Sequence, residues 1–140
     1  MNCNRCLYLC PEDVFCLPPR AKERLQVYLA HSAAGALSRF HSKVAFINFV
    51  QDVTPLCDCV APSGLPVVPD IGILASTDVV AIDRASLDLI GQSKPVGKFA
   101  GISSPDILGK LNGTDSLVQM RAAQELGLGN MEYELKERRQ

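Results

Sequence analysis

The chain has 140 residues, 21% of them charged, and a formal net charge of −1. This composition fits one globular domain, and the near-zero charge gives no basic field that would predict nucleic-acid binding. No apolar run approaches the roughly 20 residues of a membrane-spanning helix, and no signal peptide is visible. We therefore expect a cytoplasmic protein, in which the six cysteines favour metal or redox chemistry over disulfides.

The chain opens with a cysteine motif. Cys3, Cys6 and Cys10 are followed by Pro11, which gives the spacing C-x2-C-x3-C-P. Bacterial ferredoxins use C-x2-C-x2-C-x3-C-P, so only the first cysteine is missing, and it would fall one residue before Met1. Closely spaced thiolates can wrap the corners of a 4Fe–4S cluster, and the proline turns the chain away. We predict Cys3, Cys6 and Cys10 as cluster ligands, with a zinc site or inert thiols as alternatives.

Residues 21–40 follow, with apolar side chains at helical spacing. They predict an amphipathic helix, whose expected buried face consists of Leu25, Tyr28, Leu29, Ala33, Ala36, Leu37 and Phe40. Residues 44–50 are a short run of β-branched and aromatic side chains, which predicts a buried strand.

The remaining cysteines are further candidate ligands. Cys57 and Cys59 lie in a proline-rich loop, residues 51–69, and Cys16 lies five residues beyond Pro11. In an extended stretch the two thiols of C-x-C point to the same side, so they can chelate a metal or form a redox pair. A plain loop is the alternative for that pair, and a small buried hydrophobe is the alternative for Cys16.

Residues 71–75 predict a second buried strand, and residues 76–78 offer a cap for a helix that Gly91 ends. Residues 92–104 have no sustained period and predict a surface loop. The elements expected after it are a helical turn at 106–111, a helix from Thr114 or Asp115 to about residue 126, and a short final strand at 133–135.

Four aspartates are candidates for a shared polar pocket: Asp58, Asp70, Asp78 and Asp83. Three of them surround the second strand and its helix, and open α/β sheets bind ligands near strand ends. The alternatives are a helix-capping role for Asp78 and solvent exposure for Asp70 and Asp83. No Ser-His-Asp order, P-loop or dinucleotide-binding glycine motif is present, so no catalytic residue is assigned.

Several stretches resemble the Fe–S centre proteins grouped as domain-of-unknown-function family 362. They are residues 44–50, 53–59, 68–76, 78–89 and 126–135. The resemblance covers nearly the whole chain. It implies a ferredoxin-like pair of cluster motifs inserted in a larger α/β domain, of which this chain is the C-terminal part. The chain departs from that pattern in lacking the first cysteine of the motif and in having Val79 in place of a proline.

The expected fold is therefore a small, partial α/β layer with a Cys-rich, ferredoxin-like lead segment. Residues 1–19 would be the remnant of a 4Fe–4S motif, and residues 20–140 the C-terminal part of an α/β domain. Two or three strands make a poor sheet by themselves, which indicates that partner strands are missing.

The expected function is 4Fe–4S cluster binding for electron transfer or cluster-dependent oxidoreduction, with the cluster incomplete in the isolated chain. The expected partners are a redox partner or small molecule and the missing N-terminal half of the same protein, with no nucleic acid and no membrane. The alternative is a non-redox, zinc- or ligand-binding α/β module with vestigial cysteines.

Overall fold

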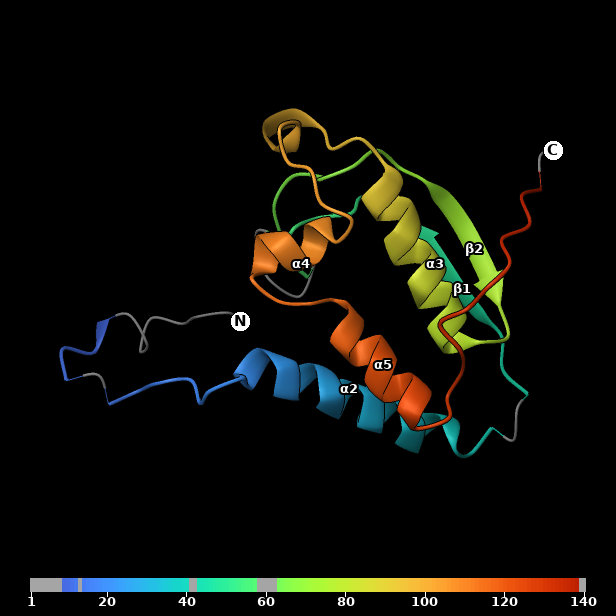
Figure 1. The fold of residues 1–140 in the computed structure, drawn as a ribbon, viewed down its shortest axis with the longest axis horizontal. Coiled ribbons are helices and arrows are strands. Elements are labelled where there is room, and N and C mark those ends of the chain that lie inside the picture. The colour runs from blue at the N-terminus through green and yellow to red at the C-terminus, as the bar shows by residue number, and fades with distance from the viewer. Residues whose placement is uncertain (1–8, 13, 41–42, 58–62, 139–140) are drawn as a thin grey trace.

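The computed structural model describes residues 9–12, 14–40, 43–57 and 63–138. Figure 1 labels its elements, which in chain order are α2 (Ala21–Leu37), β1 (Phe46–Val50), β2 (Gly72–Ser76), α3 (Val79–Gln92), α4 (Ile107–Asn112) and α5 (Leu117–Glu125). A short 3-10 turn, Gly97–Phe99, lies between α3 and α4. None of the described helices is both long and apolar enough to cross a membrane.

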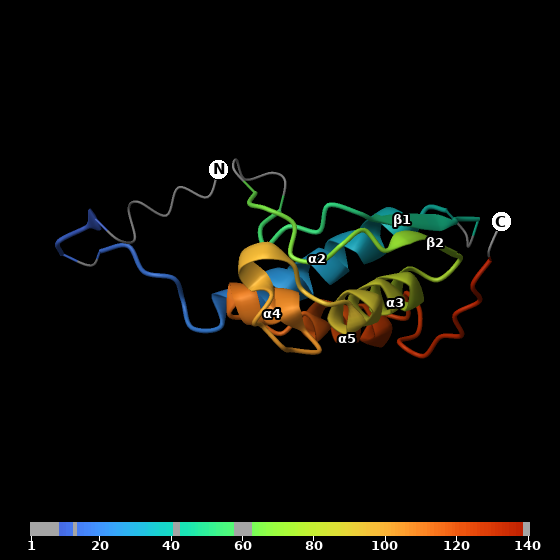
Figure 2. The same ribbon diagram turned by 90° about the horizontal axis from the view of Figure 1, so that it is seen from above.

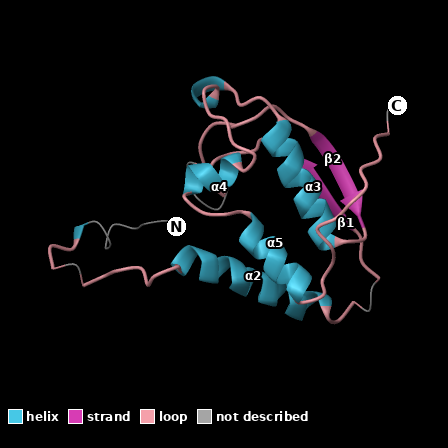
Figure 3. Cartoon of the chain, in the orientation of Figure 1, coloured by secondary structure: helices cyan, strands magenta, loops and turns pink. Residues whose placement is uncertain are grey.

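The two strands form an antiparallel pair, in which Phe46 lies opposite Ser76 and Val50 lies opposite Gly72. Helix α3 packs against one face of this pair (Figure 3). Both strands lie close to the ranges predicted from the sequence, and the mixed α/β class is confirmed. The expectation that both strands are buried is wrong for their outer face, where Ile47, Phe49 and Ile73 are exposed. The division of the chain at residue 19 stays a prediction.

The helices and strands are arranged in two layers. The strands and the C-terminal half of α2 lie toward one side, and α3 and α5 lie toward the other (Figure 2). One apolar cluster joins the base of the strands to α3 and the loops beyond it, through Val50, Val67, Val68, Ile90, Phe99 and Ile107. A smaller one joins α2, α3 and α5 through Ala30, Val80 and Ala123.

Helix α2 is turned the other way from the sequence prediction. Its one fully buried side chain is Ala30, which is 2% exposed. The predicted core residues Leu25, Tyr28 and Leu29 are instead 59%, 56% and 48% exposed. Helix α2 buries its alanine face because the neighbouring helix α5 contacts it through small side chains such as Ala123. Helix backbones approach closely where side chains are small, so the alanine face is the one that packs.

Three smaller expectations are also corrected. Helix α2 ends at Leu37 rather than at Phe40, which is exposed. Gly91 does not end α3, which continues to Gln92. Residues 133–135 form no strand and run as extended coil in the C-terminal tail (Figure 3). The cap predicted at Asp78 and the helix end near residue 127 are confirmed.

Gly91 has a packing role, since a Cβ atom there would collide with the backbone carbonyl of Pro105. Gly35, by contrast, lies within α2 with open space around it. We expect Gly91→Ala to destabilise the fold by about 1–3 kcal/mol through overpacking. Gly35→Ala should stabilise it by about 0.5–1 kcal/mol, because alanine favours the helix. Urea unfolding of both variants measures this, and equal effects of the two substitutions would refute the close approach at Gly91.

Candidate functional site

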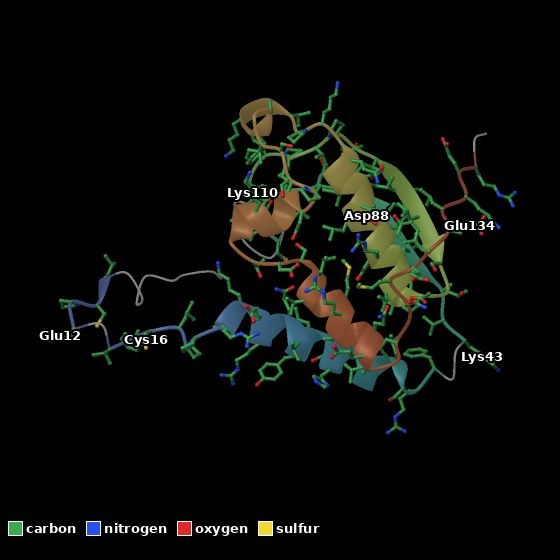
Figure 4. All side chains as sticks on the ribbon, viewed as in Figure 1. Glu12, Cys16, Lys43, Asp88, Lys110 and Glu134 are labelled. Atoms are coloured by element: carbon green, nitrogen blue, oxygen red, sulfur yellow. The ribbon has the colours of Figure 1, made fainter. Side chains whose placement is uncertain are left out.

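The described part of the lead segment, residues 9–12 and 14–20, precedes α2 and runs away from the helices and strands (Figure 4). Cys16 is exposed, so its interpretation as a small buried hydrophobe is wrong. Cys10 is half-buried, and Pro11 next to it lies in a turn. Cys3 and Cys6 lie outside the described residues. The structure therefore leaves the ligand roles of Cys3, Cys6 and Cys10 as predictions.

Cys57 lies on the long connection between β1 and β2. Backbone hydrogen bonds continue beyond the strands along this connection, from Val67 N–H to Val53 O at 2.7 Å and from Leu56 N–H to Ser63 O at 3.3 Å. The connection is thus an arm that extends from the strand pair. Cys57 is exposed near its far end, while Asp58 and Cys59 lie outside the described residues.

Asn112, the last residue of α4, ties this arm to the start of α2. Its Nδ2 donates to the backbone oxygen of Pro55 at 2.8 Å, and its own backbone oxygen accepts from Lys22 Nζ at 2.6 Å. A further hydrogen bond joins Gln26 Nε2 to Thr114 Oγ1 at 2.7 Å. The arm that holds Cys57 and the helix that follows the lead segment therefore meet at the same end of the molecule.

The described residues hold no metal-binding group by themselves. Within ranges 9–12, 14–40, 43–57 and 63–138, no three His, Cys, Asp or Glu side chains come together as a metal-binding group. Only Cys10, Cys16 and Cys57 of the six cysteines fall in these ranges. A cubane needs about four thiolates, so any cluster on this chain must use cysteines beyond the described set.

Two of the predicted pocket aspartates have structural roles. Asp78 caps α3, because its Oδ1 accepts from the N–H groups of Val80 and Ala81 at 2.9 Å. Its Oδ2 accepts from Asn130 N–H at 2.9 Å and so also holds the C-terminal tail. Asp70 accepts from Asp52 N–H at 2.9 Å, before β2 begins. The structure places Asp70 and Asp78 at opposite ends of β2, and the shared pocket that includes Asp58 stays a prediction.

Asp83 is a residue of α3 that faces β1, and it is only partly exposed. Asn48 Nδ2 donates to Asp83 Oδ1 at 3.1 Å and to Ser86 Oγ at 3.0 Å. Burial raises the pKa of Asp83 above its ordinary value, and the hydrogen bond from Asn48 opposes that rise. Asp83 is therefore not a plain surface residue, and its place in a shared pocket stays a prediction.

The C-terminal tail forms a further site that sequence reasoning missed. It borders a cavity of about 320 Å³ between β2, α3 and residues 133–136. Tyr133 Oη donates to Asp88 Oδ2 at 2.9 Å, and Arg84 pairs with the same carboxylate at 2.9 Å. Burial, and then the Asp88 hydrogen bond, raise the pKa of Tyr133. No periodic pattern links residues 45 positions apart, so the sequence held no signal for this contact.

A family model described as "Domain of unknown function (DUF362)" matches residues 14–88, which are more than half of the 140 residues. The matched segment spans α2 and both strands and ends within α3. It begins after Cys3, Cys6 and Cys10. No curated protein and no solved structure matches the chain.

The raised pKa of Asp83 has a consequence for stability. The folded protein binds the Asp83 proton more tightly than the unfolded chain, so its stability falls as pH rises from about 3.9 through the folded pKa. Asp83→Asn keeps an acceptor for Asn48 without the charge. We expect the variant to gain stability over the wild type as pH rises from about 4 to about 7. Urea unfolding at both pH values tests this, with Glu125→Gln on α5 as the exposed control. A stability difference that does not change with pH would be the contrary result.

Proposed function

This chain belongs to the DUF362 family, a domain of unknown function, and we propose that it is the C-terminal part of a 4Fe–4S protein that transfers electrons. Family membership names no chemistry, so the proposal rests on the cysteines. The one observation that supports it most is the spacing of Cys3, Cys6 and Cys10 with Pro11 directly after them. This is the ferredoxin spacing with its first cysteine absent.

The number of ligands makes the chain a part rather than a complete cluster protein. In two-cluster ferredoxins, the cysteine before the proline ligates the other cluster. Cys3 and Cys6 would then serve one cubane and Cys10 the second. Neither cubane would have its four thiolates from this motif alone. A further segment of the same protein, upstream of the motif, would supply the others.

The positions of the described cysteines support this assignment. Cys16 and Cys57 are exposed, so neither is fixed in the apolar clusters of the fold. Asn112 joins the Cys57 arm to the start of α2. A cluster at the lead segment would therefore be formed at the end of the molecule to which the arm is tied.

The outer face of the strand pair supports a missing half. Ile47, Phe49 and Ile73 are 60%, 65% and 61% exposed, and Phe49 lies opposite Ile73 in the register. The other face packs on α3. Strands that are apolar on both faces are typical of sheets covered on both sides. We therefore assign the cover of this outer face to the upstream part of the same protein.

The proposed chemistry is that of the 4Fe–4S cluster. A bound 4Fe–4S cluster accepts and donates single electrons. The residues of this chain would hold it through the thiolates of Cys3, Cys6 and Cys10, and Pro11 would turn the chain away from it. Thiolates stay available in a reducing cytoplasm, which is the compartment that we propose. The partner would then be an electron donor or acceptor, or a small molecule that is oxidised or reduced.

The test supplies the missing ligand. We expect the 140-residue chain to hold less than one cluster after anaerobic reconstitution with iron and sulfide. Placing one cysteine directly before Met1 completes the run C-x2-C-x2-C-x3-C-P. This extended chain would supply three thiolates to one cubane instead of two, so it should hold more iron than the 140-residue chain and show stronger charge-transfer absorbance of iron thiolates. Iron and zinc counting by mass spectrometry, with absorbance, provides the measurement.

Matched variants separate the motif from other thiols. Cys6→Ala in the extended chain should abolish this gain in iron, whereas Cys16→Ala, which removes a thiol outside the motif, should not. One zinc ion in place of iron, or no metal at all, would favour the non-redox alternative. About four irons on the unextended chain, lost in Cys10→Ala, would show that the chain is self-sufficient and would contradict the assignment as a part.

A further inference from the structure

The outer face of α2 is an uncovered apolar surface. It consists of Leu25, Tyr28 and Leu29, which follow one another at helical spacing and are 59%, 56% and 48% exposed. Together they leave on the order of 300 Å² of apolar area in water, which is large for one helix face. Single exposed leucines are normal on a surface, but three large side chains on one stripe are not.

The charged residues along α2 are mostly basic. Residues 20–43 contain five Lys or Arg and one acidic residue, Glu23. Glu23 is already paired with Arg20 at 2.6 Å. Arg24 stays beside the stripe, with its guanidinium 6.0 Å from the centre of the Tyr28 ring. Lys22 and Arg39 are exposed near its two ends. The stripe therefore has a basic border.

The side chains that follow the stripe along α2 are small. Ser32, Gly35 and Ala36 are exposed and lie one and two turns beyond Leu29, and nothing lies within 4 Å of a Cβ atom placed on Gly35. Small side chains next to large ones let a second helix approach closely. A bilayer gains nothing from such a notch, because insertion depends on large apolar side chains.

We propose that the outer face of α2 binds an acidic, amphipathic helix of a separate protein. The apolar stripe of that helix would pack on Leu25, Tyr28 and Leu29, and its acidic flanks would face Arg24 and Arg39. A second copy of this chain does not fit, because α2 against α2 would bring two basic borders together. One docked helix buries an area at the low end of protein interfaces, which is typical of brief encounters.

The outer face of α2 lies next to the cysteine-rich lead segment along the chain. Helix α2 begins shortly after Cys16 in the chain, so its outer face adjoins the lead segment (Figure 4). The bound protein would be the electron donor or acceptor. That identification rests on the proposed function, whereas the binding of an acidic helix does not. The two can fail separately, because the binding test needs no cluster.

The experiment is a selection from a displayed library of helical peptides with leucines at helical spacing and random flanking positions. We expect the selected flanks to be rich in Glu and Asp. A selected peptide should bind the 140-residue chain in fluorescence anisotropy and weaken as salt rises, since exposed charges are screened. Leu25→Glu together with Leu29→Glu should reduce its affinity at least tenfold. Both positions are exposed, and circular dichroism checks that the variant is folded.

The control variant is Leu135→Glu, which changes an equally exposed leucine in the C-terminal tail and should leave binding unchanged. Neutral or basic selected flanks, or no selected peptide, would overturn the proposal. So would a dimer in analytical ultracentrifugation that the Leu25/Leu29 variant dissolves, because the occupant would then be a second copy. Binding to phosphatidylserine vesicles that the same variant abolishes would assign the surface to membranes instead.

Discussion

The contact between α2 and α5 determines which face of α2 is buried and which is exposed. Its buried residues are Ala30 and Ala123, which lie beside Val80 of α3, and Met120 of α5 packs against the same cluster. The small side chains let the helices approach closely. The large side chains of α2 lie on its opposite, outer face. One local choice of packing thus produces both a tight three-helix junction and an uncovered apolar stripe.

Polar side chains with two partners connect segments that are distant in the sequence. Asp78 caps α3 and also binds Asn130 N–H in the tail. Asp106 accepts from Gly109 N–H at the start of α4 and from Ser116 N–H before α5. Asn112 joins α4 to the Cys57 arm and to α2. The apolar clusters are small, so these shared hydrogen bonds define where the connections lie.

The sequence was a good guide to local structure. Periodicity located both strands and α3, and the cap at Asp78 follows from a carboxylate placed before a helix. It failed where the answer depended on a neighbour. The buried face of α2 depends on the alanines of α5. The glycine at position 91 suggests a helix end in the sequence, but its actual role is to leave room for the backbone oxygen of Pro105. The tail runs as coil and is held by the hydrogen bond from Tyr133 to Asp88, a contact that no local sequence pattern indicates.

The candidate site likewise has a part that the sequence could predict and a part that depends on long-range contacts. The spacing of Cys3, Cys6 and Cys10 is a purely local signal and could be recognised in the sequence. The bond network through Asn112, which brings the Cys57 arm toward α2, joins residues 57 and 90 positions apart and could not. Asp70 and Asp78 are close in sequence, but an extended strand separates them.

Helix α2 turns its large apolar residues to the outside, and the packing described above depends on this orientation. Hydroxyl-radical footprinting of the chain, with the sites of oxidation located by mass spectrometry, measures it. Leu25, Tyr28 and Leu29 should be oxidised about as fast as the exposed Leu135, and Val80, which is 2% exposed, should be protected. Protection of Leu25, Tyr28 and Leu29 to the level of Val80 would contradict the account.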